Sequence, residues 1–327
     1  MQEKMILSID ELSVLFPNDE MTSAIPVLNK ASLNLKKGEI VALVGESGSG
    51  KTILSRAIMN LIPSPGYISD GKIIFNELNL LDLQREEMVK IRGRKISLIV
   101  SNPKGELDPL ETVGQQICNV LIHHLDFSYS QAKKKAISLL RDVRIPDPES
   151  RFNAFPHELS GGMAQRVIIA IALACDPELI ISDDATSGLD VTVQAQVLDL
   201  LDKLVREKGS SLIFITRDLG VAAHFADQIM VIYKGQIVEK NNVQDFFKDP
   251  KHPYSNLLLA SFSNDPEIKK IWTQKLSLEP EDISIKKCVF CDRCIKAKPK
   301  CFHSEPEMIT IEGDLQVRCF NPIERAL

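Results

Sequence analysis

Two kinds of apolar pattern in the first part of the chain predict two kinds of strand. Residues 5–15 and 31–36 alternate between apolar and polar positions, as in strands with one exposed face. The segment EIVALVG at 39–45 contains a continuous apolar run that stops at a glycine, as in a buried strand of a parallel sheet. The helical pattern KTILSRAIMNLI follows it. We therefore expect a half-exposed sheet followed by a buried strand and a helix.

Further along the chain, strand and helix patterns alternate. The buried strands LIIS (179–182) and SLIFIT (211–216) are separated by the helical stretch VTVQAQVLDLLDKLVREKG. Strand, helix and strand in this order predict a parallel α/β sheet. Between about 84 and 175 the pattern is mostly helical, which predicts a helical subdomain inserted into the α/β core.

After about residue 265, proline and charged residues become denser and then cysteines appear. This change predicts a boundary between a domain at 1–265 and a small cysteine-rich C-terminal domain at 266–327. The total of 327 residues fits one core of roughly 200 to 250 residues with a smaller neighbour.

Composition narrows the class of protein. With 44% hydrophobic and 25% charged residues the chain has the average composition of globular proteins, which excludes disorder and coiled coil. The 39 basic and 44 acidic residues leave a net charge of −5, so we expect no nucleic-acid partner. The longest clean apolar run, Val167 to Cys175, is less than half of the roughly 20 residues that span a bilayer. The N-terminus has no secretory pattern, so a cytosolic location is predicted.

The segment GESGSGKT, from Gly45 to Thr52, has the pattern G-x-x-x-x-G-K-[ST] between a buried strand and a helix. Glycines let the backbone curl so that N–H groups point inward, and the helix N-terminus adds a positive dipole end. We expect Lys51 to reach the β and γ phosphates and Thr52 to hold Mg²⁺. The predicted ATP-binding residues of this phosphate loop are Gly45, Ser47, Gly48, Ser49, Gly50, Lys51 and Thr52.

A second glycine-containing helix start occurs in HELSGGMAQR at 157–166. Without a lysine it would make a poor nucleotide site on its own. Here the chain resembles an ATP-binding-cassette (ABC) subunit, whose LSGGQ or LSGGM signature caps the γ-phosphate of ATP bound to a partner subunit. The resemblance assigns this role in trans to Ser160, Gly161, Gly162 and Met163.

The resemblance extends over most of the chain. LIISD matches the Walker B strand, with Asp183 as an outer ligand of Mg²⁺, and SGLD matches the D-loop, which ends at Asp190. KHPYSNLL at 251–258 is similar to the oligopeptide/dipeptide importer branch. The implied fold is an α/β P-loop NTPase cassette. It has a parallel-rich sheet core, an antiparallel β subdomain and an inserted helical subdomain, followed by the cysteine-rich domain.

Three positions depart from the family pattern at catalytic places. Ser101 stands where the family has a glutamine that contacts Mg²⁺ and the attacking water, and serine is too short for both tasks. Asp184 replaces the glutamate that polarises water and withdraws the carboxylate by about 1.5 Å, and misplacements of about 1 Å cost about 10²-fold in rate. Arg217 replaces the switch histidine and has no acceptor. We expect a degenerate site that binds ATP and hydrolyses it slowly.

The resemblance also implies partners. These are a second ABC ATPase subunit whose active site this signature completes, two transmembrane permease subunits and an extracytoplasmic solute-binding protein. The expected function is to power import of peptides or similar small solutes from the cytoplasmic face of the cell membrane. The alternatives are a non-hydrolysing regulatory subunit, a fully competent ATPase of another importer, for example for a metal chelate, and a cassette protein of DNA repair or translation.

Five of the seven cysteines lie in the last 40 positions, in the pattern C-x2-C-x2-C-x6-C with one more downstream. Such closely spaced thiolates bind Zn²⁺ or ligate an iron–sulfur cluster. Peptide-importer subunits are similar at Cys288, Cys294, Cys301 and Cys319, and this resemblance favours a [4Fe–4S] cluster. Cys291 is an alternative ligand, and Zn²⁺ or no metal are the other interpretations.

Overall fold

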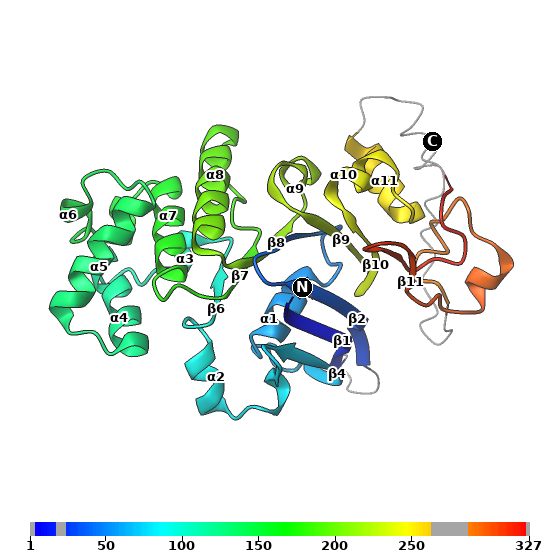
Figure 1. Cartoon of the computed structure of the whole chain (residues 1–327), viewed down its shortest axis with the longest axis horizontal. Coiled ribbons are helices and arrows are strands. Elements are labelled where there is room, and N and C mark those ends of the chain that lie inside the picture. The colour runs from blue at the N-terminus through cyan, green and yellow to red at the C-terminus, as the bar shows by residue number, and fades with distance from the viewer. Residues whose placement is uncertain (1–3, 18–23, 263–286, 325–327) are drawn as a thin grey trace. The chain divides into compact units, whose positions relative to one another are not determined.

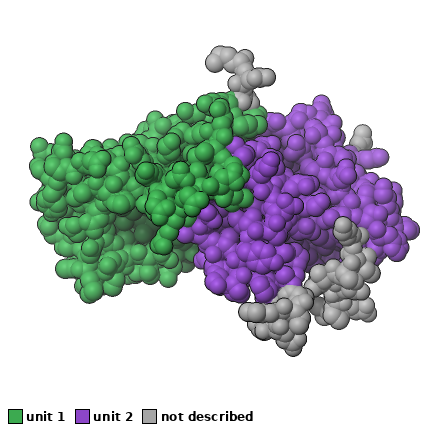
Figure 2. Space-filling model, turned by 90° about the horizontal axis from the view of Figure 1, so that it is seen from below, with its two compact units in different colours: residues 1–6, 35–39, 75–215 green, residues 7–34, 40–74, 216–327 purple. Residues whose placement is uncertain are grey.

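The computed structural model (Figure 1) describes residues 4–17, 24–262 and 287–324. The chain forms two compact units, drawn in green and purple in Figure 2. The first unit comprises Met1–Ile6, Leu35–Glu39 and Phe75–Ile215, and the second comprises Leu7–Asn34, Ile40–Ile74 and Thr216–Leu327. Each unit is therefore built from segments that are distant in the sequence.

Three parallel strands form the sheet of the first unit, in the order β8-β7-β6. They are β6 (Ile96–Ile99), β7 (Leu179–Asp183) and β8 (Ser211–Thr216). In the central strand, Ile181 lies opposite Leu98 of β6 and Ile213 of β8. The first four residues of β7 are buried, which explains why this strand is nearly continuously apolar in the sequence.

Helices make up most of the rest of the first unit. The described ones are α2 (Arg85–Ile91), α3 (Pro103–Glu106), α4 (Val113–Leu125), α5 (Tyr129–Asp142), α6 (Pro148–Arg151), α7 (Gly161–Ala172) and α8 (Val191–Lys208). Strand β5 (Leu78–Asn79) and the 3₁₀ turns η1 (Leu80–Asp82) and η2 (Pro156–Glu158) are short. The side chains of Thr112 and Ser128 accept hydrogen bonds at the starts of α4 and α5, which pack against each other and against α7.

The second unit contains two groups of strands. In one group β1 (Met5–Pro17) lies between β2 (Ala24–Lys36) and β4 (Tyr67–Phe75). In the other group β3 (Ile40–Val44) pairs in parallel with β9 (Gln228–Tyr233). Antiparallel pairs then connect β9 to β10 (Gln236–Asn242), β10 to β12 (Leu315–Val317), and β12 to β11 (Ile309–Glu312).

The helices of the second unit cover a hydrophobic core. They are α1 (Lys51–Ile58), α9 (Leu219–Phe225), α10 (Val243–Lys248), α11 (Pro253–Phe262) and the 3₁₀ turn η3 (Pro299–Phe302). Val44 of β3, Phe246 of α10 and Tyr254 of α11 belong to one buried cluster together with Phe290 and Cys288. The described C-terminal segment, 287–324, therefore shares its core with the strands and helices that precede it.

Two sequence expectations need comment here. The first helix ends at Ile58 instead of continuing to residue 62, because Asn60 adopts a positive φ of 49° and the Leu61 N–H donates back to the Arg56 carbonyl. The expected boundary at residue 265 lies outside the described residues and stays a prediction. Across the described ranges, no helix is both long and apolar enough to span a membrane.

Candidate nucleotide-binding site

The phosphate loop connects β3 to α1, and close packing explains its glycines. A Cβ atom at Gly45 would lie 2.3 Å from the Ile232 carbonyl oxygen. Gly50 adopts a φ of 102° at the N-cap of α1, a conformation that residues with a side chain rarely adopt. Ser47 and Gly48 are exposed. The loop therefore presents its backbone at the start of a helix, where an anion is stabilised.

Lys51 is almost completely buried, with 8% of its surface exposed. Its Nζ donates to the carbonyl oxygens of Gly45 (2.8 Å) and Glu46 (2.7 Å) and to Ser49 Oγ (3.2 Å). The ammonium group is thus held inside the loop by neutral oxygen atoms, which the oxygens of a phosphate can replace with stronger, charge-assisted bonds. Thr52, the expected Mg²⁺ ligand, is exposed at the start of α1. The residues fit the ATP- and Mg²⁺-binding role predicted from the motif.

Two carboxylates lie at the C-terminal end of strand β7 in the first unit. Asp183 is its last residue, and the Asp184 N–H donates to the Ile215 carbonyl oxygen at 3.0 Å. Asp184 has a φ of 53°, in the left-handed region that aspartate tolerates better than most residues. Since Ile99 of β6 lies opposite Ser182 of β7, the exposed Ser101 leaves the sheet at the same edge as the two aspartates.

The predicted site residues are divided between the two units. Asp183, Asp184 and Ser101 belong to the first unit, whereas the phosphate loop and Arg217 belong to the second. Arg217 is exposed and directly precedes Asp218, whose side chain accepts the N–H of Gly220 at the start of α9. The roles of the three departing positions in hydrolysis stay predictions.

The signature residues begin helix α7 in the first unit. Ser160 is the N-cap and its Oγ accepts the Met163 N–H at 3.2 Å. A Cβ atom at Gly162 would lie 2.6 Å from Cγ1 of Val193, so α8 approaches α7 closely at this glycine. Asp190 caps α8 by accepting the Val193 N–H at 2.9 Å. The signature and the D-loop are therefore packed against each other.

An open hollow of about 470 Å³ lies over these helix starts. The signature residues and Asp190 line it together with two arginines, Arg144 and Arg166. Arg166 donates to the Val143 carbonyl oxygen at 3.2 Å, and burial, followed by repulsion from Arg144, lowers its pKa below the ordinary value. Two positive charges beside a helix N-terminus favour an anion. The sequence analysis missed both arginines, although Arg166 stands within the signature segment.

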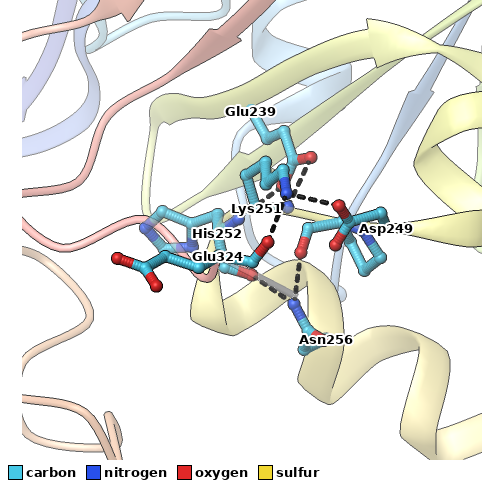
Figure 3. Close-up of polar contacts among 7 residues, drawn as sticks. Glu239, Asp249, Lys251, His252, Asn256 and Glu324 are labelled. Carbon is cyan, nitrogen blue, oxygen red and sulfur yellow. Dashed lines mark hydrogen bonds and ion pairs between the residues drawn. The ribbon is translucent and has the colours of Figure 1, made fainter. Parts of the chain in front are cut away.

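The HPY residues, 252–254, are the buried bend at His252 and the first two residues of helix α11, here called the HPY turn; Figure 3 shows His252 close to Glu239 of strand β10. Glu239, which is fully buried, accepts the N–H groups of Lys251 at 2.9 Å and His252 at 2.7 Å. His252 Nδ1 accepts the Tyr254 N–H at 3.0 Å, and Asn256 Nδ2 donates to the His252 carbonyl oxygen at 3.3 Å. Burial lowers the pKa of His252 to about 3, so its imidazole is neutral at pH 7. One hydrogen bond of the turn, from the Tyr254 N–H to Nδ1, thus requires an uncharged histidine.

Comparison with known proteins identifies the family. Residues 28–187 match the model of the ABC transporter family, and residues 238–301 match that of the oligopeptide/dipeptide transporter, C-terminal region. The oligopeptide transport ATP-binding protein AppD of Bacillus subtilis (strain 168) is 43% identical over 298 residues, which are 90% of this chain and 91% of that protein. The chain belongs to the ATP-binding proteins of the ABC transporter family.

Other relatives agree over nearly the full length. The dipeptide transport ATP-binding protein DppD of Haemophilus influenzae is 40% identical over 319 residues, covering 97% of this chain and 96% of the relative. The solved dimer of the ATP-binding cassette MJ0796, bound to ADP and Pi, superimposes with a TM-score of 0.64 at 28% identity, covering 72% of this chain and 98% of that one. These findings confirm the predicted ABC cassette fold. ATP-binding subunits of ABC importers are peripheral proteins of the cytoplasmic face, as predicted.

The five C-terminal cysteines of this ABC protein, all described and all in the second unit, form no disulfide bond. Burial, together with the neighbouring thiols of Cys288, Cys294 and Cys301, raises the pKa of Cys319 to about 12. The Sγ of Cys291 instead lies 3.6 Å from Asp292 Oδ1. The four cysteines that the family resemblance singled out are therefore electrostatic neighbours of one another.

These thiols do not form a metal site as they stand. Within 4–17, 24–262 and 287–324, no group of three or more Cys, His, Asp or Glu side chains is arranged to hold a metal ion. The sulfur atoms are partly engaged with backbone, since Cys319 Sγ accepts the Asn321 N–H at 3.3 Å and Cys301 Sγ the Lys298 N–H at 3.5 Å. The structure does not support the expected [4Fe–4S] cluster, which stays a prediction.

Proposed function

We propose that this ABC protein is the ATP-binding subunit of an importer for peptides or similar small solutes. The observation that carries the proposal is the pairing of a formed phosphate loop, with Lys51 held inside it, with a C-terminal region of the oligopeptide/dipeptide type. The relatives AppD and DppD are named for oligopeptide and dipeptide transport. The C-terminal match also counts against a cassette of DNA repair or translation.

The test is transport by the assembled importer in proteoliposomes. The partners expected in it are a second ATPase subunit, two transmembrane permeases and a solute-binding protein. ATP-dependent accumulation of a labelled di- or oligopeptide, reduced by Lys51→Ala, supports the proposal. Uptake of a metal chelate without uptake of any peptide would instead favour the alternative importer.

The second part of the proposal concerns how ATP binding and ATP hydrolysis are divided between the two ATPase subunits. The signature hollow, with Ser160 at the start of α7 and two arginines beside it, would complete the active site of the partner subunit. This chain's own site would hold ATP through the phosphate loop, with Thr52 and Asp183 as holders of Mg²⁺, which supplies charge neutralisation at the phosphates. The MJ0796 cassette, solved as a dimer, supports a paired arrangement.

The slow hydrolysis proposed for this chain rests on the residues themselves. Ser101 and Asp184, at the edge of the β6–β7 pair, have side chains too short to reach as far as glutamine and glutamate. The exposed Arg217 has no proton acceptor to offer. Together these changes are expected to lower hydrolysis by about 10²- to 10⁴-fold while leaving binding intact.

Mutating each ATPase subunit separately in the complex distinguishes this proposal from a purely regulatory subunit. We compare Lys51→Ala here with the equivalent lysine change in the partner. Loss of turnover from both changes supports an ATP clamp that the cycle requires. Loss from the partner's change alone favours the regulatory alternative.

We also propose that Cys288, Cys294, Cys301 and Cys319 ligate a [4Fe–4S] cluster once iron and sulfide are supplied. The thiols of Cys288, Cys294 and Cys301 lie close enough to Cys319 to act on its pKa, which supports this ligand set, and Cys291, which contacts Asp292, stays the alternative ligand. Iron analysis and absorbance near 400 nm on anaerobically purified protein test the proposal. A colourless protein with stoichiometric zinc would contradict it.

A further inference from the structure

Glu46, the second residue of the phosphate loop, is bonded to two segments far away in the sequence. Its backbone N–H donates to the phenol oxygen of Tyr254 at 3.0 Å. Its carboxylate accepts two hydrogen bonds from the guanidinium of Arg293, from Nη1 at 2.9 Å and from Nη2 at 3.0 Å. Tyr254 belongs to the HPY turn and Arg293 to the cysteine segment, so both C-terminal features converge on one residue of the loop.

The Tyr254 side chain is rigidly placed. It is fully buried, and its ring lies 4.4 Å from that of Tyr233 and 5.5 Å from that of Phe290, measured between centroids. Burial raises the pKa of Tyr254 above its ordinary value, which keeps the phenol neutral. The HPY turn holds the backbone of this tyrosine through His252. The Glu46 N–H therefore donates to a phenol oxygen that cannot move without breaking the hydrogen bonds of the HPY turn.

The Arg293 side chain is held by contacts on its other sides. Its guanidinium lies over the rings of Tyr233, at 5.7 Å, and Phe290, at 5.9 Å, and Nη1 also donates to the Tyr233 hydroxyl at 3.4 Å. The hydrogen bonds to Glu46 are the main reason that the pKa of Arg293 lies above its ordinary value. Because two hydrogen bonds join the restrained Arg293 guanidinium to Glu46, they fix the orientation of the Glu46 carboxylate as well as its distance from Arg293.

Glu46 passes this restraint to the lysine of the loop. Its carbonyl oxygen accepts the Lys51 ammonium at 2.7 Å, while its amide and carboxylate are held by Tyr254 and Arg293. Every polar group of Glu46 is therefore engaged. Moving this residue would displace the backbone of the loop, whose N–H groups the motif assigns to the phosphates.

We propose that Tyr254 and Arg293 are positioning residues that hold the phosphate loop in the conformation that binds ATP, acting through Glu46. This inference rests on the proposed function, because it assumes that the loop binds ATP. It gives the HPY turn and the cysteine segment a common role in nucleotide binding. Neither residue needs to contact the nucleotide for this role.

The test is equilibrium binding of fluorescent mant-ATP with Mg²⁺ to the full-length chain. Arg293→Ala and Glu46→Gln each raise Kd by about three- to tenfold, the range expected for a lost ion pair that is partly exposed. The double variant is no weaker than the worse single one, since both remove the same interaction. Arg293→Lys, which keeps the charge and one bond, restores part of the affinity.

Tyr254→Phe removes only the acceptor for the Glu46 amide and raises Kd by about threefold. This effect persists in high salt, whereas the Arg293 effect shrinks because salt screens an exposed pair. The matched control is Lys287→Ala, which breaks the 2.8 Å ion pair with Asp292 in the same segment and leaves the Arg293 and Tyr254 side chains that hold Glu46 in place. Its Kd stays at the wild-type value.

The outcomes separate the two claims. If the wild-type chain binds mant-ATP no better than Lys51→Ala, the proposed function itself fails. If Lys51→Ala loses binding while the Arg293 and Tyr254 variants match wild type, only this inference is overturned. The same holds if the effects of Arg293→Ala and Glu46→Gln on Kd simply add in the double variant. Should Arg293→Ala fail to fold, Arg293→Lys and Tyr254→Phe carry the same test.

Discussion

The neutral, buried histidine of the HPY turn makes the protein sensitive to acid in a way that can be calculated. His252 is fully buried, its Nδ1 accepts the Tyr254 N–H, and burial lowers its pKa to about 3 from an unfolded value of about 6.5. A folded pKa below the unfolded one means that the unfolded chain binds the extra proton between these values. The stabilisation is therefore complete above about pH 6.5 and declines as the pH falls towards 3.

The magnitude follows from the 1.5 pH units between about 6.5 and pH 5.0. At about 1.36 kcal/mol per unit, lowering the pH from 7.5 to 5.0 costs about 2 kcal/mol of unfolding free energy through this residue alone. His252→Asn removes the titration but keeps an acceptor at the position of Nδ1. The variant is less stable at both pH values, and its loss between them is smaller than that of wild type by about 2 kcal/mol.

The assay is urea unfolding at pH 7.5 and pH 5.0, followed by circular dichroism. Tyr254→Phe serves as the control, because it removes the neighbouring phenol oxygen, which accepts the Glu46 N–H, but keeps His252 and the backbone N–H that it accepts, and should keep the wild-type pH dependence. Equal pH dependence in wild type and His252→Asn would refute the reasoning, since it would mean that folding does not exclude a proton from this imidazole.

Two further predictions concern the signature and the catalytic carboxylate. Gly162→Ala places a Cβ atom 2.6 Å from Val193 Cγ1 and should destabilise the protein by about 1–3 kcal/mol in thermal unfolding. Adding Val193→Ala should restore the lost stability. An unchanged Tm in the single variant would contradict the close packing of α7 and α8. Asp184→Glu lengthens the carboxylate by about 1.5 Å and should raise single-turnover hydrolysis at this chain's site by about tenfold or more. No gain in that rate would show that carboxylate reach is not what limits the site.

The sequence predicted which elements carry the phosphate loop and the signature, because each motif is contained in a few consecutive residues. The phosphate loop lies between a buried strand and a helix, as GESGSGKT predicted, and the signature serine caps α7. The family comparison then confirmed the cassette fold inferred from these segments.

Contacts between distant residues could not be predicted in the same way. Arg293 reaches Glu46 across 247 positions, and nothing in the sequence around either residue points to this contact. The HPY residues were recognised only by resemblance, because the burial of Glu239 and His252 depends on how β10 and the C-terminal segment pack. Such interactions depend on tertiary packing, which the periodicity of one segment does not encode.

The most direct test of the proposed asymmetry is the nucleotide content of the assembled ATPase pair after a single turnover. The complex is loaded with radiolabelled ATP and Mg²⁺, quenched with acid, and the bound ATP and ADP are counted. Our account predicts about one ATP left intact for each ATP hydrolysed, with the intact ATP lost when Lys51→Ala is introduced in this chain. Equal hydrolysis at both sites would contradict it.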